Sequence, residues 1–202
     1  LLAAAFALLL GVPLGGLAGY RGGWTDTLIS RSIEAILCFP TIVLILVLLT
    51  GGPRWLQDLP EVLRISLVLG LTGWVAVARY LRGEFMKLKS SDMVAAARSM
   101  GGGHLRITGR YILPCAAAPV LVTAAFTVAS AIVMEAALSF IGLGVPPTVS
   151  TWGGLLNDAR DTIERAWWLA LFPGLALFLA ILGCNLLGEG VRDWLDPRHR
   201  ET

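Results

Sequence analysis

Charged residues are scarce in this sequence. Asp, Glu, Lys and Arg make up only 15% of its 202 residues, whereas 56% are hydrophobic, and the mean hydropathy is +0.74. Such values fit a protein that crosses a membrane several times far better than they fit a soluble domain. The net charge of +2 is too small to indicate nucleic-acid binding, so we expect the lipid bilayer, and no nucleic acid, as a partner.

Signatures of catalysis are missing as well. There is no G-x-x-x-x-G-K-[ST] phosphate loop, no H-E-x-x-H zinc motif and no G-x-S-x-G nucleophile motif. The two histidines, His104 and His199, lie in separate polar segments, and we expect His104 to be a solvated loop residue. We therefore predict that this chain has no catalytic residue, no metal site and no bound cofactor. An intramembrane enzyme is the weakest of the functions considered.

Cysteine is rare, and an initiating methionine is absent. Cys38, Cys115 and Cys184 lie within or beside apolar runs without C-x-x-C spacing, so we expect small buried apolar side chains there. Leu1 opens directly into an apolar run with no basic region before it, so no signal peptide is evident. We expect the chain to be a fragment that lacks sequence before Leu1.

Long apolar runs, by contrast, are abundant. A membrane-spanning helix needs about 20 mostly apolar residues. Five segments meet this requirement, at approximately 1–19, 33–50, 62–80, 113–137 and 167–188. Runs that are this long and do not alternate with polar residues are helices rather than barrel strands. The predicted fold class is therefore all-α, a polytopic membrane helix bundle with five spans in a single domain over residues 1–202.

Glycine and proline mark two of these segments. Gly11, Gly15 and Gly19 are spaced by four residues, so they share one helix face and would allow close contact with a neighbouring helix. Chance in a glycine-rich helix is the alternative. Pro13 in the first segment and Pro40 in the second are expected to kink their helices. Kinked helices are compatible with a transport pathway but do not establish one.

The distribution of Lys and Arg predicts the orientation of the bundle, because basic residues gather in the cytoplasmic loops of membrane proteins. Twelve belong to one set of alternating segments: Arg21, Arg31, Arg79, Arg82, Lys87, Lys89, Arg98, Arg106, Arg110, Arg192, Arg198 and Arg200. Four belong to the other set: Arg54, Arg64, Arg160 and Arg165. We therefore expect a protein of the inner or plasma membrane whose chain starts outside and ends in the cytoplasm.

Two features of the predicted outer side each allow more than one interpretation. The loop 139–166 could cap the bundle or receive a partner from outside, or it could be a re-entrant or interfacial segment anchored by Trp152, Trp167 and Trp168. Glu135 lies inside a span, where it either pairs with a neighbouring helix or loop or faces an aqueous path, and we favour the pairing. A single intramembrane acid is weak support for a secondary transporter or channel that works alone.

The polar stretch 84–112 lies near the centre of the sequence. Asp92 is a suitable N-cap for a short helix, 93–100, which Gly101–Gly103 would end through a left-handed residue. A second helix would start near His104 and lead into the next span. A short helix with an alanine face can fit into a groove on another protein, because small side chains allow close approach. We expect this corner to pass the movement of a cytoplasmic partner to the membrane spans.

Several segments carry a resemblance to a known family. AAARSMGGGHLRITGRYILP, at 95–114, resembles the cytoplasmic EAA motif of membrane subunits of binding-protein-dependent ABC importers, in which Glu-Ala-Ala precedes a Gly and an Ile/Leu-Pro element. Four more are similar to the second-permease type of the dipeptide, oligopeptide and nickel branch: GVPLGGLAGYRGGWTDTLISR at 11–31, MEAALSFIGLGVPP at 134–147, WGGLLNDAR at 152–160 and LFPGLALFLAILGCNLLGEGVRDWLDPR at 171–198.

The resemblance implies the fold of type I ABC importer permeases and the function of a transmembrane permease subunit. Two permease subunits, usually of two related kinds, would form the pathway, two cytoplasmic ATPases would bind ATP and Mg, and an extracytoplasmic binding protein would deliver substrate. ATP binding would move the coupling helices and open the pathway, and hydrolysis would reset it. The implied cargo is a di- or oligopeptide, with nickel or another metal chelate as the alternative.

The same resemblance assigns the ATPase-docking residues: Met93, Val94, Ala95, Ala96, Ala97, Arg98, Met100, Gly101, Gly102 and Pro114. This sequence departs from the family pattern twice. The motif glutamate falls at Ala95, so its carboxylate contacts with the ATPase are expected to be absent. The family also has a first spanning helix and an external region before the point where this chain begins, which agrees with a truncated start.

Overall fold

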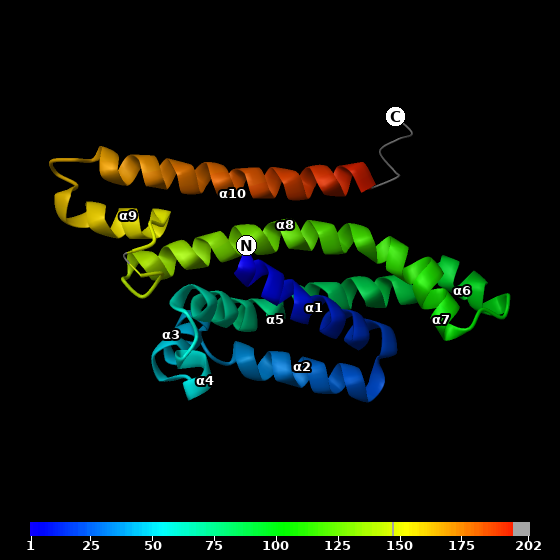
Figure 1. Cartoon of the computed structure of the whole chain (residues 1–202). Helices are drawn as coiled ribbons and strands as arrows, with labels where there is room; N and C mark the ends of the chain where they lie inside the picture. The colour runs from blue at the N-terminus through cyan, green and yellow to red at the C-terminus, as the bar shows by residue number, and fades with distance from the viewer. Residues whose placement is uncertain (147, 196–202) are drawn as a thin grey trace.

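The computed structural model describes residues 1–146 and 148–195, and every regular element in these two ranges is helical (Figure 1). The prediction of an all-α fold is therefore confirmed. The long helices are α1 (Leu2–Arg21), α2 (Gly23–Leu37), α5 (Glu61–Lys89), α8 (Leu113–Phe140) and α10 (Trp168–Leu195). The shorter elements are α3 (Thr41–Gly51), α4 (Arg54–Gln57), α6 (Asp92–Ser99), α7 (His104–Ile107), the π-helix η1 (Thr108–Ile112), α9 (Trp152–Ala159) and the 3-10 turn η2 (Arg160–Thr162).

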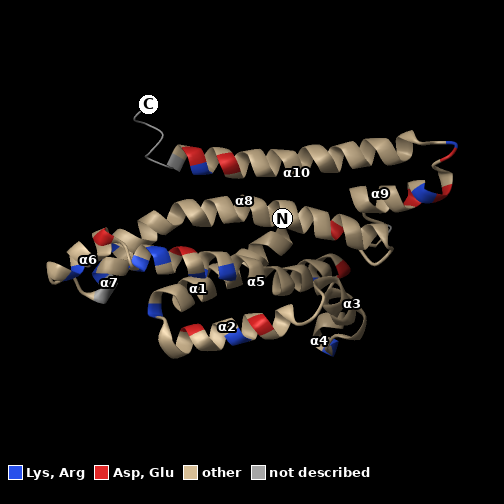
Figure 2. Ribbon diagram, turned by 180° about the vertical axis from the view of Figure 1, so that it is seen from behind, with Lys and Arg blue, Asp and Glu red and all other residues tan. Residues whose placement is uncertain are grey.

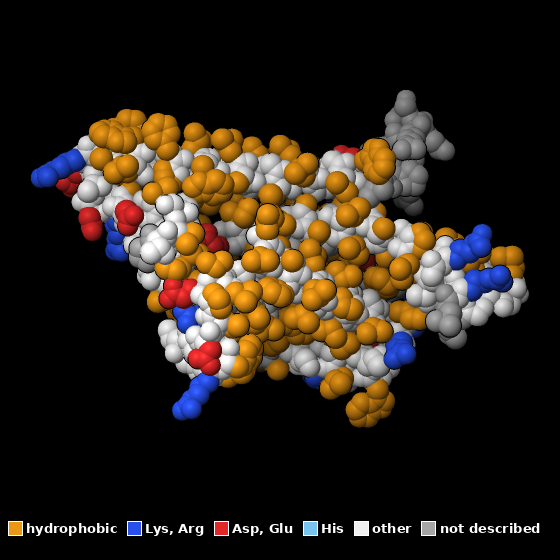
Figure 3. All heavy atoms as spheres, viewed as in Figure 1, with side chains coloured by type: hydrophobic (Ala, Val, Ile, Leu, Met, Phe, Trp, Pro, Cys, Tyr) orange, Lys and Arg blue, Asp and Glu red, His pale blue; other side chains and the backbone are white. Residues whose placement is uncertain are grey.

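Four of the five predicted spans are long apolar helices among the described residues: Leu2–Arg21, Glu61–Lys89, Thr108–Phe140 and Trp168–Trp194. Charged residues gather around α6 and the adjoining helix ends on one side, and around α4 and the α9–α10 connection on the other (Figure 2). Apolar side chains cover the broad band between them (Figure 3). This distribution is the one a membrane-embedded bundle requires, with charges at the two interfaces.

The remaining span, expected as one helix over 33–50, is formed differently. Two helices, α2 and α3, meet at a bend of 84°, and α2 already begins at Gly23. Pro40 lies at the break with an extended ψ of 123°. Proline lacks an N–H group and disfavours helical backbone in the residue before it. The kink expected at Pro40 is thus a break between helices, whereas α1 continues uninterrupted through Pro13.

The close contact predicted for the glycine face of α1 is confirmed, and its partner is α5. Methyl groups at Gly11, Gly15 and Gly19 would lie within 3 Å of atoms of Val77, Ala78 and the Arg82 backbone. From the opposite side, Gly70 of α5 packs on Phe6. Backbones can approach this closely only where side chains are absent.

The expected burial of the cysteines is wrong for the described chain. Cys38 and Cys115 are exposed and Cys184 is half-buried. Cys115 and Cys184 lie on α8 and α10, whose spanning segments are only 17% and 6% buried in this chain. The rest of the described chain therefore leaves most of the surface of these two helices uncovered. The predictions for the side chain of His104 and for Pro147, Arg198, His199 and Arg200 lie outside the described residues.

Candidate functional site

The short helix α6 is fixed to the bundle by two of its side chains. Val94 is 1% exposed and Ala97 is 3% exposed, and both pack into a cluster that includes Phe85 of α5, Ile107 of α7 and Ile112 of η1. Positions 94 and 97 share one helix face because they are three residues apart. The N-cap is Ser91 rather than the expected Asp92, and the Ser91 hydroxyl donates to the carbonyl of Leu88 at 2.7 Å.

The opposite face of α6 points away from the bundle. Met93, Ala95, Ala96 and Met100 are exposed there, with Met100 76% exposed. Arg98 is exposed too, but it lies four residues from Val94 and lines a cavity with Asp26 of α2. Of the residues predicted to dock an ATPase, Val94 and Ala97 are therefore packed into the chain's own core, whereas the others on α6 are exposed. Pro114 is exposed in the first turn of α8.

A glycine turn ends α6 and reverses the chain. Gly101 has the left-handed φ of 78° that the sequence predicted. Its N–H donates to the Arg98 carbonyl at 2.9 Å, and the N–H of Gly102 donates to the Ala97 carbonyl at 3.0 Å. These two bonds form a Schellman motif, which satisfies the last carbonyls of a helix. A methyl group at Gly102 would lie 2.6 Å from the Ala97 oxygen, so both glycines are required by geometry.

The glycine turn leads directly into the apolar span Thr108–Phe140. α7, η1 and α8 follow one another directly from His104 to Phe140, and the Leu113 N–H donates to the carbonyl of Thr108, five residues earlier. The wide turn lies immediately before Pro114, which has no N–H to continue an ordinary helix. The predicted second helix is confirmed, and it makes the corner and the span one continuous element.

An ion pair that the sequence did not predict joins α2 to α5 beside this corner. The Arg82 guanidinium holds both carboxylate oxygens of Asp26, with one contact of 2.8 Å, and both side chains are largely covered. Asp26 lies in the first turn of α2, where the helix dipole favours an acid. A cavity of about 340 Å³ next to the pair is lined by Asp26, Lys89 and Arg98. The start of α2, the end of α5 and α6 thus meet at one place.

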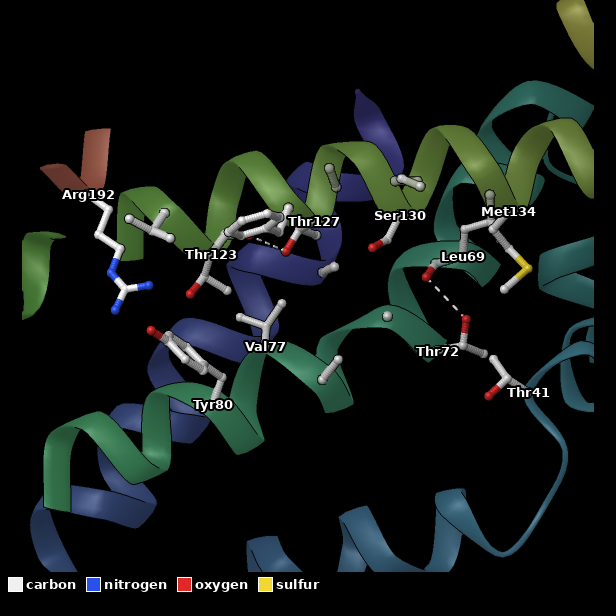
Figure 4. A pocket seen from close by; sticks show the side chains of 18 residues that line it. Thr41, Leu69, Thr72, Val77, Tyr80, Thr123, Thr127, Ser130, Met134 and Arg192 are labelled. Carbon is white, nitrogen blue, oxygen red and sulfur yellow. Dashed lines mark hydrogen bonds between the residues drawn. The ribbon is translucent and has the colours of Figure 1, made fainter. Parts of the chain in front are cut away.

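A larger cavity of about 440 Å³ lies among α1, α5 and α8 (Figure 4). Small residues such as Ala3, Ala7 and Gly73 form part of its wall. Six of the lining residues carry hydroxyl groups: Thr41, Thr72, Tyr80, Thr123, Thr127 and Ser130. Arg192 of α10 reaches toward the Tyr80 hydroxyl at one end. A mostly apolar space with several hydroxyl groups on its wall can hold a small molecule with polar groups inside a membrane domain.

The sequence contained a signal for this cavity. Thr123, Thr127 and Ser130 are spaced by four and three residues, which places them on one face of α8. Their partners on α5 follow no comparable pattern. Only the packing of α5 against α8 shows that Thr72 and Tyr80 face the same space.

Glu135 pairs within its own helix. The Ser139 hydroxyl donates to the Glu135 carboxylate at 2.7 Å, and Glu135 is half-buried. The predicted partner on a neighbouring helix or loop is thus wrong, because the partner of Glu135 lies four positions along α8. Ser139 is covered in turn, because Gly144 and Gly153 pack directly on it.

The loop 139–166 contains α9, which packs against both α8 and α10. A methyl group at Gly153 would lie 2.3 Å from the Ala136 carbonyl, so α9 fits closely on α8. The Thr151 hydroxyl caps the helix by accepting from the Gly154 N–H at 3.1 Å. Trp167 and Trp168 are exposed and contact each other edge to face at 5.9 Å. The loop folds back onto the bundle and presents aromatic side chains at its edge.

Comparison with known proteins shows which family has this architecture. Residues 11–201 match the family described as the binding-protein-dependent transport system inner membrane component. The chain belongs to this family. The resemblance predicted from the sequence is therefore confirmed. The family description names an inner membrane component, in agreement with the several apolar helices of this chain.

Several curated relatives of this chain are named as permease proteins of transport systems. The chain is 34% identical over 199 residues to the oligopeptide transport system permease protein OppC of Bacillus subtilis, with 98% of this chain and 63% of the relative covered. It is 37% identical over 193 residues to the dipeptide transport system permease protein DppC of Alkalihalophilus pseudofirmus, with 95% and 61% covered. The chain thus spans less than two thirds of the length of these relatives.

Solved structures of transporters share the fold. One in an inward-facing conformation, the MetNI methionine ABC transporter, superposes with a TM-score of 0.79 at 16% identity, over 96% of this chain and 89% of the other. An amino acid ABC transporter gives a TM-score of 0.69 at 21% identity, over 96% and 87%. The fold is therefore that of type I ABC importer permeases, as the resemblance implied.

Proposed function

We propose that this chain is the transmembrane permease subunit of an ATP-driven importer and that α6 with its glycine turn docks a cytoplasmic ATPase. The observation that carries the proposal is the division of α6 into two faces. Val94 and Ala97 hold the helix to α5 and to the start of α8, while Ala95, Ala96 and Met100 are left for a partner. A force on the outer face is thereby passed to two spans at once.

The ligand of the pathway is a di- or oligopeptide. Support comes from the names of the relatives, an oligopeptide permease and a dipeptide permease, and from the hydroxyl-lined cavity of about 440 Å³. A space of this size is within the range of about 300–1,000 Å³ found for small-molecule sites. The cavity lies between α5 and α8, the two spans to which α6 is joined, so movement of α6 would change its shape.

The assembly contains further subunits. A second permease subunit, two ATP-binding subunits and an extracytoplasmic binding protein complete the importer, and ATP with Mg binds to the ATPases. The weakly buried faces of α8 and α10 are available to the second permease or to lipid. The α6 corner and the C-terminal end face the cytoplasm, because most Lys and Arg lie on that side.

Paired cysteine variants test the docking face. Ala96→Cys, on the exposed face, should crosslink to a cysteine placed in the membrane-facing groove of the ATPase subunit. Ala97→Cys is the matched control, because the Ala97 side chain is itself only 3% exposed and packs with Phe85 of α5. The experiment uses the assembled transporter with native cysteines replaced, and crosslinks are read by electrophoresis. Equal crosslinking of both positions, or of neither, would contradict the proposed orientation of α6.

A further inference from the structure

We propose that Arg192 and Tyr80 form a carboxylate-binding subsite at the cytoplasmic end of the large cavity, where they hold the C-terminal carboxylate of a peptide in transit. The inference rests on the proposed function, since a peptide reaches this place only if the cavity belongs to the pathway. It adds a specific chemical group of the substrate and the two side chains that recognise it.

The charge distribution of the cavity is the first reason. Arg192 is the one charged side chain among the described residues that line it, and all the others are apolar or carry hydroxyl groups. Arg192 has no ion pair within residues 1–146 and 148–195, although Glu189 and Asp193 lie near it on α10. The Arg192 side chain is exposed at the edge of this largely apolar space, without an ion pair among the described residues. A guanidinium in such a place is suited to bind an anion, and its planar fork matches a carboxylate.

The position of Tyr80 is the second reason. Its phenol comes from α5 and Arg192 comes from α10, yet both line the same end of the cavity and their polar ends point toward each other (Figure 4). Tyr80 is 47% exposed, so this end of the cavity is open. An arginine in the last turn of a helix is favoured by the helix dipole alone, so its place on α10 indicates no ligand. The Tyr80 hydroxyl, a neutral donor directed at the same space, is an independent observation that the helix dipole does not explain. Together the two groups offer several donors to one oxyanion.

The remaining polar groups complement the other end of a peptide. The hydroxyl groups of Thr72, Thr123 and Thr127 donate to backbone carbonyls of their own helices, at 3.1, 2.6 and 2.7 Å. Each hydroxyl proton is thereby used, and the oxygen lone pairs are left as acceptors. Acceptors of this kind suit an ammonium group. A short zwitterionic peptide would thus lie along the cavity with its carboxylate at Arg192 and its ammonium among the hydroxyls.

Protection of a cysteine in the cavity tests the proposal. The complete transporter, with Cys38, Cys115 and Cys184 replaced by Ala and with Ser130→Cys added, is placed in nanodiscs without the binding protein. The rate of maleimide labelling is measured against increasing Ala-Ala and against its C-terminal amide. We expect the free acid to protect at about tenfold lower concentration than the amide, because a charge-assisted bidentate pair is lost with the amide.

Variants then identify the groups responsible. Arg192→Gln should abolish the difference between acid and amide, Tyr80→Phe should reduce it, and Arg192→Lys should retain part of it. Arg21→Gln, which removes a basic residue outside the cavity, should leave the difference unchanged. Basal ATPase activity and gel filtration confirm that each complex is assembled, and Tyr80→Phe provides a second test if Arg192→Gln does not assemble.

The outcomes separate this inference from the proposed function. Equal protection by acid and amide in the unsubstituted protein, or a difference that survives Arg192→Gln, would overturn the carboxylate subsite while leaving the pathway intact. Absence of protection by either peptide would instead overturn the assignment of the cavity to the pathway.

Discussion

Gly15 of α1 lies directly on the backbone of Ala78 in α5. A methyl group at position 15 would come within 2.5 Å of the Ala78 carbonyl oxygen and 2.9 Å of its Cα. The contact is therefore between two backbones, and neither helix can yield by rotating a side chain. Ala78 is fully buried, as the contact requires.

Gly15→Ala should therefore destabilise the protein by about 1–3 kcal/mol, the usual cost of overpacking a tight contact. Gly83→Ala is the matched control on α5, because nothing lies within 4 Å of the added methyl group. Alanine also has the higher helix propensity, so the control should be neutral or slightly stabilising. Thermal unfolding in detergent, followed by the loss of monodisperse protein, measures both. Equal stabilities would show that α1 and α5 can separate at no cost.

The pair of Asp26 and Arg82 should contribute measurably to the position of α2. Asp26→Asn and Arg82→Gln, combined in a double-mutant cycle, should give a coupling free energy of about 1–2 kcal/mol, because the pair is bidentate and partly covered. Arg31 and Glu34 are the control, since their side chains are 76% and 58% exposed. Exposed pairs of this kind contribute about 0.3–0.5 kcal/mol. A coupling no larger than that of the control would contradict a role for Asp26 and Arg82 in joining the helices.

Gly101 should be required for coupling, since its φ of 78° is unfavourable for other residues. Gly101→Ala should cost about 1–2 kcal/mol in the turn and lower the peptide uptake driven by each ATP hydrolysed. Gly103→Ala is the control, because Gly103 has no positive φ and open space around its Cα. Uptake and ATPase rates are measured together in proteoliposomes. If Gly101→Ala keeps the ratio of peptide uptake to ATP hydrolysis found for the unsubstituted protein, the turn does not transmit movement.

Ala95→Glu should preserve or strengthen association with the ATPase. Position 95 is exposed, so the longer side chain meets no clash within this chain and restores the carboxylate found in the family motif. One added hydrogen bond to a charged group would strengthen binding by about tenfold or more. Ala97→Glu, at a buried position, should instead dislodge α6. Titration of the purified ATPase onto the permease measures both, and weaker binding of Ala95→Glu would show that the groove facing this position has diverged.

The predicted orientation can be read by chemical labelling. Ser99→Cys, at the end of α6, should react with a membrane-impermeant maleimide only when the cytoplasmic side is accessible. Asp158→Cys, in α9, should react only from the outside. Both native residues are exposed, so both variants should label efficiently on the correct side. The reverse pattern would invert the topology.

The sequence by itself determined the helical class, four of the spans, the glycine face of α1 and the turn at Gly101. Each is a local property: long apolar runs require helices in lipid, and a left-handed residue after a helix requires glycine. The same reasoning predicted a kink at Pro40 within one helix, whereas the structure has a break between two helices. The bend of 84° depends on how α3 packs beside α5, which no local pattern encodes.

Only the tertiary structure decided which residues of the corner are available to a partner. Ala95, Ala96 and Ala97 are equivalent by composition, yet Ala97 is buried by Phe85 and Ile112, which come from other parts of the chain. The Asp26 and Arg82 pair and the cavity between α5 and α8 arise in the same way. Their members are far apart in sequence, and they meet because apolar faces elsewhere on the same helices pack together. Helix formation is a local matter, whereas the choice of facing side chains is decided by the packing of the whole bundle.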